Sequence, residues 1–343
     1  MKPWIVLLFL FPLWNEAFPQ ETSIASPTPS KWKVRHKNFI QKTDSILMAF
    51  QRRTSPLDSN YIVRPPGTWT FKVKNNISRT HLKAKGHLHG DSFKSHMKTN
   101  VRSTVSLSAT YRGVTLGFAV NPARLTGKNH DFELNVTSYG NRYGFDYNYM
   151  SASTFHGYIQ LPVHNLNIGN DIMKFRSSSS NIYYVFNNKK FSLPAAFTQS
   201  YLQKRSAGSF FLGASYFGSN MRISTSNPAG YDIKRISTIH AGVNVGYGYN
   251  LVAPHNLLFH FSFQPTMVLF SYNRIFYYDD TKDKSNDWSD ILVTGRIAVV
   301  HYFNKRYFGG LTFNYNDSRT GDSDKILISN GKWKGRVILG MRL

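Results

Sequence analysis

The segment IHAGVNVGYGYN, from Ile239 to Asn250, decides the fold of this chain. Its odd-numbered positions are all apolar, and its even-numbered positions are histidine, glycine or asparagine. Successive side chains of a β-strand point to opposite faces, so this period of two predicts a strand with one apolar and one polar face. Soluble β-sandwiches and membrane β-barrels both contain such strands, and the rest of the sequence must distinguish them.

The same alternation recurs from about residue 67 onward, in segments of roughly ten residues, the length of a membrane-spanning strand. In the segment from Trp333 to Leu343, apolar residues share one face, while Lys334, Arg336 and Arg342 share the other. Charge on that face fits a water-filled lumen better than a sandwich core, although this strand alone leaves both open. Glycines on the polar faces are expected to keep the lumen open or to let strands bend.

The lengths of the connections favour the barrel. In an outer-membrane barrel, short periplasmic turns alternate with longer external loops. Counted back from the last strand, the expected short connections are 303–305, 250–256, 203–207, 139–141 and 112–113. The expected long connections include 316–332, 273–291, 218–237 and 80–100. The weakly patterned region 151–179 and the brief NNKK at 187–190 break the regularity. We therefore predict an all-β, antiparallel up-and-down transmembrane β-barrel of about 12 strands (12–14), preceded by a short helical segment.

The N-terminal segment MKPWIVLLFLFPLWNEA has the features of a secretory signal peptide. One lysine precedes an apolar run from Trp4 to Trp14, and a small residue follows at Ala17. The run is too short and too interrupted for a transmembrane anchor, which needs roughly 20 apolar residues. The predicted organisation is a signal peptide at 1–17, a flexible basic arm at 18–37, a short amphipathic helix and linker at 38–66, and the barrel at 67–343.

Composition sets the environment and the partners. The 343 residues carry a net charge of +24 and include 20 Tyr and 26 Phe, with a mean hydropathy of -0.35. A barrel reconciles the aromatic content with the polar average, because only half of each strand faces lipid. The positive charge is either generic surface charge or a sign of polyanion contact. We expect a bacterial outer-membrane location, with outer-membrane lipid, lipopolysaccharide and the barrel assembly machinery as partners, and no nucleic acid, since no such motif is present.

Two segments carry a family resemblance. They are LDSNYIVRPPGTW at 57–69 and PAAFTQSYLQKRSAGSFFLGASYF at 194–217, and the run from Gln203 to Ser209 is the most distinctive part. From about residue 35 onward the chain resembles the bacterial family called domain of unknown function 4421. The resemblance implies an outer-membrane-type β-protein of Gram-negative bacteria with no known activity. The segment ends in Leu343, where barrels usually carry an aromatic residue.

Two groups of polar residues are candidates for a functional site. The first has two interpretations, a lumenal cluster that binds a ligand or plug at the periplasmic end, or a turn network that fixes strand register, which we favour. It consists of Gln199, Gln203, Arg205, Ser206 and Ser209. The second comprises charges that the alternation places toward the lumen, and their pairing decides whether a path stays open. These are Glu133, Asp146, Arg296, Arg336 and Arg342.

The sequence gives little support for catalysis. His240, His260 and His301 lie on predicted strands, but no G-x-S-x-G elbow marks a serine partner. A hydrolase would need one serine and one histidine side chain within about 3 Å. The chain has no cysteine and hence no thiolate nucleophile.

Metal and cofactor sites are not expected either. The pair His87 and His89 lacks a third ligand, and the aspartates of 279–287 lack the spacing of a calcium loop. The favoured function is a non-enzymatic barrel, either a small-solute pore or a structural surface protein. The alternatives are a barrel that binds polysaccharide or lipopolysaccharide, and a membrane-embedded hydrolase.

Overall fold

The computed structural model describes most of the predicted barrel and little that precedes it. The described residues are Ser45, 57–65, 67–88, 91–111, 114–122, 131–162, 165–223, 233–278, 282–285, 291–321 and 326–343. The chain divides into the units 1–48 and 49–343, and all elements below belong to the second. The predicted signal peptide, basic arm and helix lie outside the described residues, except for Ser45, which is helical. No helix within the described ranges is long and apolar enough to cross a membrane.

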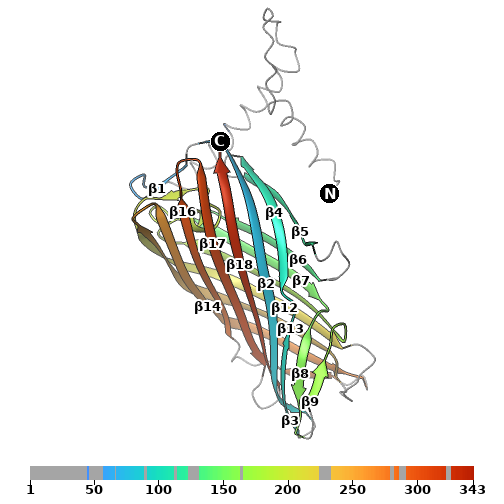
Figure 1. Cartoon of the computed structure of the whole chain (residues 1–343). Helices are drawn as coiled ribbons and strands as arrows, with labels where there is room; N and C mark the ends of the chain where they lie inside the picture. The colour runs from blue at the N-terminus through green and yellow to red at the C-terminus, as the bar shows by residue number, and fades with distance from the viewer. Residues whose placement is uncertain are drawn as a thin grey trace, which may run out of the picture. The chain divides into compact units, whose positions relative to one another are not determined.

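One antiparallel sheet of 16 strands forms the body of this unit and curls round on itself (Figure 1). Its strands are β2 (Trp69–Leu88), β3 (Asp91–Lys98), β4 (Arg102–Tyr111), β5 (Val114–Val120), β6 (Phe132–Tyr139), β7 (Tyr143–Ala152), β8 (His156–Gln160), β9 (Asn165–Ile168), β10 (Met173–Val185), β12 (Ala207–Ile223), β13 (Ile233–Ala253), β14 (Leu257–Tyr277), β15 (Lys282–Ser285), β16 (Ile291–Tyr302), β17 (Tyr307–Gly321) and β18 (Ile326–Arg342). A second, two-stranded sheet pairs β1 (Ile62–Val63) with β11 (Leu202–Gln203), and α4 (Leu193–Phe197) lies between β10 and β11.

Strand order follows the chain around the wall, which is the name we give to the curled sheet. The last strand, β18, pairs with β2 along its whole length, from Arg342↔Thr70 to Ile326↔Gly86. The other edge of β2 is shared by β3 and β4, which together fill one position in the wall. The short strands β8 and β9 extend from β3, and β15 extends from β14. Without these three, the strands occupy twelve positions. The predicted all-β antiparallel fold is confirmed.

The opening segment lies on β13, and its two faces differ as predicted. His240, Asn244 and Asn250 are fully buried, whereas Val245 and Tyr247 are 55% and 45% exposed. The apolar face therefore points outward and the polar face inward. A soluble sandwich would place the apolar face inside, so this direction identifies the outer surface as the lipid-facing one.

The connections differ from the prediction in two ways. Because β10 ends at Val185 and β12 begins at Ala207, the expected turn at 203–207 is wrong, and residues 186–206 form a single connection. Residues 187–190 therefore lie at the barrel end where short connections were expected. The brief NNKK segment is then no longer an exception to the alternation of short and long connections. Much of the expected long loops is instead strand, since β17 and β18 stay paired out to Gly321↔Leu327. Alternation fades there because neither face needs to be apolar beyond the membrane.

The strands are longer than a bilayer requires. β13 and β14 have 21 residues each, about 70 Å at 3.3 Å per residue. A tilted strand crosses the membrane in roughly 10 residues. The wall therefore projects well beyond the apolar band on the side opposite the short connections.

Two interior glycines make room for aromatic rings and do not hold the lumen open. A Cβ atom on Gly340 would lie 2.1 Å from the ring of Phe308, and one on Gly144 would lie 2.1 Å from the ring of Tyr183. Both rings are buried, at 1% exposure. The expected role of these glycines in keeping the lumen open is therefore wrong for these two positions, where a neighbouring side chain occupies the space.

We expect Gly340→Ala to lower the free energy of unfolding by about 1–3 kcal/mol, the usual cost of overpacking. The Phe308 ring that must move packs against the Tyr302 ring and the Arg342 guanidinium. The control is Gly335→Ala on the same strand, where the nearest atom to a new Cβ lies 4.0 Å away. Urea unfolding followed by gel mobility measures both variants, and equal midpoints would contradict this interpretation.

Candidate functional site

The connection from β10 to β12 folds back into the barrel end, and we call its central part, residues 191–199, the plug. Its helix α4 is capped by Ser192, whose side chain accepts a hydrogen bond from the amide of Ala195. It is ended by Gln199, which has a left-handed backbone (φ 51) at the position where helices commonly take this conformation. Every residue from Phe191 to Phe197 is buried.

Apolar packing fills the barrel end around the plug. The side chains of Phe191, Leu193 and Phe197 belong to one buried cluster with wall residues from several strands. Those wall residues are Tyr183, Val185, Ala207, Phe211, Leu258, Ala298 and Val300. All are at most 8% exposed. The interior at this end is therefore a packed core.

Polar side chains of the wall bind the backbone carbonyls at the end of the plug. Tyr302 donates its hydroxyl to the carbonyl of Ala195 at 3.2 Å, and Arg342 donates to that of Gln199 at 2.9 Å. The ammonium of Lys72 donates to the carbonyl of Thr198 at 2.5 Å. A short helix leaves its last carbonyls without partners. These donors satisfy one carbonyl of α4 and two of the residues that follow it.

Gln203, from the first predicted group, lies at the centre of a second network. Its Oε1 accepts hydrogen bonds from the amide of Ser192 at 3.0 Å and from Nδ2 of Asn250 at 3.1 Å. Its Nε2 donates to the carbonyls of Lys190 at 2.6 Å and Arg205 at 2.9 Å. This amide group therefore joins both ends of the connection to strand β13.

The other four members of that group lie close by. The Nε2 of Gln199 donates to the carbonyl of Ala196 inside the plug. Ser206 Oγ accepts from an amide at the end of β13, and Ser209 Oγ accepts from an amide of the 186–206 connection. Arg205 is exposed, with its guanidinium 6.0 Å from the half-buried ring of Tyr61. Gln199, Gln203, Ser206 and Ser209 thus hold the plug and its connection, whereas Arg205 lies apart from the interior.

A serine–histidine–asparagine arrangement adjoins the plug. His260 Nδ1 lies 2.7 Å from Oδ1 of Asn250, and its Nε2 lies 3.0 Å from Oγ of Ser262. Because the asparagine oxygen can only accept, Nδ1 must carry the hydrogen, and Nε2 is left to accept the serine proton. Serine hydrolases use this order of donors. Sequence reasoning missed Ser262, although its spacing of two from His260 puts both on one face of a strand.

The arrangement is nevertheless inaccessible. Ser262 has no exposed surface, and His260 is 2% exposed. The Phe197 ring of the plug lies edge-on to the imidazole, with centroids 5.0 Å apart. The amide of Asn250 also donates to the carbonyl of Ser192 at 2.9 Å. These contacts make the three side chains part of the network that seats the plug.

On the lumenal side of the plug, charged side chains cluster around Glu133. Its carboxylate lies 2.7 Å from Nζ of Lys332, 3.4 Å from the guanidinium of Arg102 and 4.0 Å from Nζ of Lys334. All four side chains are at most 15% exposed. One carboxylate thus faces three cations.

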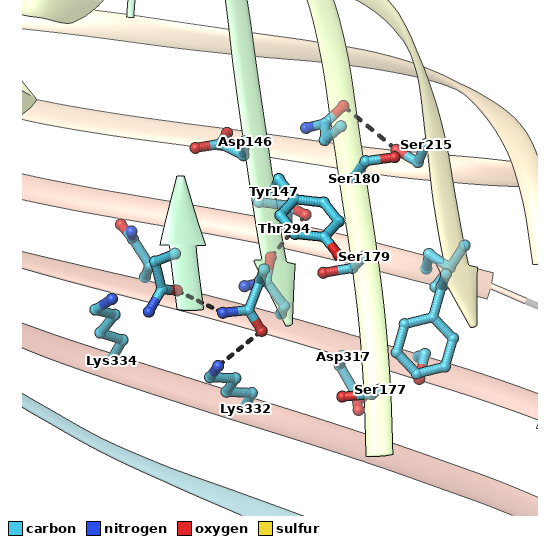
Figure 2. Close-up of a pocket in the computed structure, with 18 of the residues that line it drawn as sticks. Asp146, Tyr147, Ser177, Ser179, Ser180, Ser215, Thr294, Asp317, Lys332 and Lys334 are labelled. Carbon is cyan, nitrogen blue, oxygen red and sulfur yellow. Dashed lines mark hydrogen bonds between the residues drawn. The ribbon is translucent and has the colours of Figure 1, made fainter. Parts of the chain in front are cut away.

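A second ion pair, between Arg296 and Asp146, also lies in the lumen. Arg296 donates to Asp146 at 2.9 Å and to Gln264 at 3.1 Å, and the Tyr139 hydroxyl donates to the other oxygen of Asp146 at 2.7 Å. Figure 2 shows Asp146, Asp317, Lys332 and Lys334 around a pocket that serines, other polar side chains and several apolar side chains also line. This lumenal cavity has a volume of about 150 Å³.

Basic residues dominate the interior. The basic side chains that face inward are Lys72, Lys74, Arg102, Arg296, Lys332, Lys334, Arg336 and Arg342. Among the described residues, no carboxylate lies within 4 Å of Lys74 or Arg336. Of the second predicted group, Glu133, Asp146, Arg296, Arg336 and Arg342 all lie in this interior. Lys334 had also been placed on the lumen face, whereas Lys72, Lys74, Arg102 and Lys332 were missed, although alternation in 72–80 and 330–342 could have found most of them.

Metal ligands do not gather in the part of the chain that the structure describes. No group of three His, Cys, Asp or Glu side chains is placed to hold an ion there. His89, Asp279, Asp280 and Asp287 lie outside the described residues.

Fold and faces together define an antiparallel β-barrel of outer-membrane type, plugged at one end. The chain belongs to the family Domain of unknown function (DUF4421), whose profile matches residues 56–342. This confirms the resemblance found in the sequence. No curated protein matches the chain.

Three solved structures illustrate the structural likeness. The outer membrane protease OmpT from Escherichia coli is 9% identical with a TM-score of 0.45, covering 82% of this chain and 98% of that one. The translocator domain of autotransporter NalP from Neisseria meningitidis is 9% identical with a TM-score of 0.32, covering 93% and 100%. The outer membrane protein OprG from Pseudomonas aeruginosa is 8% identical with a TM-score of 0.28, covering 80% and 96%. Similarities of this size say nothing about activity.

Proposed function

We propose that the protein is a barrel of the bacterial outer membrane that binds an anionic ligand in its lumen and does not conduct solutes. The observation that carries this proposal is the plug. A pore needs a continuous path along the barrel axis, and residues 191–199 fill one end with buried apolar side chains. This favours the ligand-binding alternative over the small-solute pore.

The outer surface supports the membrane location. Phe261, Leu311 and Leu339 are each 57–59% exposed on three different strands of the wall. A soluble protein rarely exposes so much apolar surface. Together with the predicted signal peptide, this surface favours insertion into the outer membrane.

The interior charge supports an anionic ligand. Lys74 and Arg336 have no carboxylate partner among the described residues, and Glu133 serves three cations. Cations held in a partly desolvated site bind phosphate or carboxylate oxygens more strongly than exposed ones do. The phosphates of lipopolysaccharide fit this interior better than a neutral polysaccharide.

The test uses the refolded full-length protein. In a planar bilayer we expect no steady conductance, and by calorimetry we expect pyrophosphate to bind. Lys74→Gln/Arg336→Gln should weaken that binding at least about tenfold, because two charge-assisted contacts are lost. The matched control is Lys83→Gln/Lys85→Gln, which removes the same charge from exposed positions farther along β2. Steady conductance would overturn the proposal, as would pyrophosphate binding that the first double variant leaves unchanged.

A hydrolase is the second candidate, favoured by the Asn250–His260–Ser262 arrangement. Since the plug covers Ser262, we expect a fluorophosphonate probe to leave the wild-type protein unlabelled. Labelling that disappears in Ser262→Ala would establish a reactive serine and revive the hydrolase. Ser209→Ala serves as the control, since Ser209 is equally buried but has no histidine contact among its hydrogen bonds.

A further inference from the structure

The wall has a seam between β5 and β6. Among the described strands, β5 pairs with β4 and β6 pairs with β7, and no backbone register joins β5 to β6. Both strands lie on the same side of the barrel in Figure 1. Between the described residues of β5 and β6 there is thus no ladder of backbone hydrogen bonds, and such an interruption in a membrane is costly unless something else occupies the gap.

A cavity lies at this seam. Its volume is about 790 Å³, within the range of sites that hold small molecules. Residues of β2, β4 and β18 line its inner side, and residues of β5 and β6 line both edges of the seam. The cavity therefore connects the lumen wall with the edge that faces lipid.

The two sides of this cavity differ in chemistry. The inner side carries four cations, which are Lys74, Arg102, Lys334 and Arg336. The carboxylates of Asp131 and Glu133 also line the cavity, so the cations exceed the carboxylates by two. The seam side carries apolar side chains that are 36–63% exposed, which are Leu107, Phe118, Val120, Phe132 and Leu134. A molecule that satisfies both sides has an anionic group and an apolar tail.

Donors on the inner side remain available. Arg102 is 4% exposed, and its Nε and Nη1 have no hydrogen-bond partner among the described residues. Arg336 donates Nε to Asn76 at 2.6 Å and has no acidic partner within the described part of the chain. Buried donors of this kind are usually satisfied, so a missing acceptor is expected here.

We propose that the seam cavity binds a phospholipid with an anionic headgroup, which enters from the membrane between β5 and β6. The phosphate oxygens would accept from Arg102, Arg336 and Lys74, since guanidinium groups match phosphate in a two-pronged geometry. The acyl chains would lie along Phe118, Phe132 and Leu134. This inference rests on the proposed function and names the ligand class. A free anion would use the inner side alone and would leave the apolar edges uncovered.

The experiment is native mass spectrometry of the full-length protein in detergent, with added phosphatidylglycerol, phosphatidylcholine or diacylglycerol. We expect one phosphatidylglycerol to remain bound and the other two lipids to be lost. Phe118→Ser/Leu134→Ser should reduce its retention at least about tenfold, because two apolar contacts are lost. The same variant should bind pyrophosphate like the wild type. The control, Phe261→Ser/Phe263→Ser, changes two similarly exposed residues on β14, away from the seam, and should retain the lipid.

Each outcome separates this inference from the proposed function. Equal retention of phosphatidylcholine, or retention unchanged by Phe118→Ser/Leu134→Ser, overturns the lipid site, while pyrophosphate binding would leave the proposed function standing. If the wild-type protein also fails to bind pyrophosphate, both the lipid site and the proposed function are overturned. If the serine variant does not fold, Phe118→Trp replaces it. Stoichiometric phosphatidylglycerol with brominated acyl chains should then quench the fluorescence of the introduced indole more in Phe118→Trp than in Phe261→Trp, and equal quenching overturns the site.

Discussion

Replacing residues 191–199 with a Gly–Ser linker of equal length should turn a silent barrel into a conducting one. The plug fills one barrel end with Phe191, Leu193 and Phe197, and three wall donors hold its carbonyls. Without these side chains, the lumen gains an axial path that is lined by Lys72, Arg342 and the other inward-facing cations. Single-channel recording should therefore show steady currents that favour anions over cations.

The matched control for this variant is the same type of linker in place of residues 303–306, an exposed turn at the same end. It should fold and stay silent, because no side chain of that turn belongs to the packed end. A milder variant, Asn250→Ala, removes one hydrogen bond to the plug, one to Gln203 and one to His260 and should give brief openings. A folded but silent linker variant would show that the lumen is closed elsewhere.

Glu133→Gln should both destabilise the barrel and tighten its hold on anions. The carboxylate pairs with Lys332, Lys334 and Arg102 at 2.7–4.0 Å, and its own side chain is 12% exposed. Removing one partner of a buried ion pair costs about 3–5 kcal/mol, and contact with lumenal water places this site toward the lower value. The released cations should at the same time bind pyrophosphate more tightly than in the wild type.

A double-mutant cycle checks this prediction. Glu133→Gln/Lys332→Gln should recover part of the lost stability, because it removes one of the unpaired charges that the single change leaves behind. Urea unfolding measures the first effect and calorimetry the second. An unchanged urea midpoint for Glu133→Gln would show that the cluster is already well hydrated and contributes little to stability.

Local periodicity explains what the sequence predicted well. The faces of β13 and β18 follow from the alternation of side chains along a strand, which needs no knowledge of the neighbours. Glu133, Asp146 and Arg296 were placed in the interior for the same reason. The pairing of these charges was not predicted, because the contact of Glu133 with Lys332 depends on strands far apart in the chain.

Features without periodicity could not be predicted. Residues 186–206 have neither a strand nor a long-helix pattern, so the sequence revealed their distinctive polar residues but not the plug. The seam was equally hidden, because Phe132 and Leu134 alternate with polar residues whether or not β6 has a partner on that side. The division of β2 between β3 and β4 likewise depends on backbone pairing, which leaves no mark in the order of residues.

The pairing of β18 with β2 bears on how the barrel is assembled. It joins the first long strand of the wall to the last, across nearly the whole sequence of the unit, and such distant contacts form late in folding. Arg342, on β18, also binds the carbonyl of Gln199 in the plug. Joining of β2 to the rest of the wall and seating of the plug thus depend on the same late strand. An interrupted or unfinished insertion would leave β2, β4 and β5 detached from β17 and the plug without this anchor, so the barrel end is fully held only when the last strand arrives.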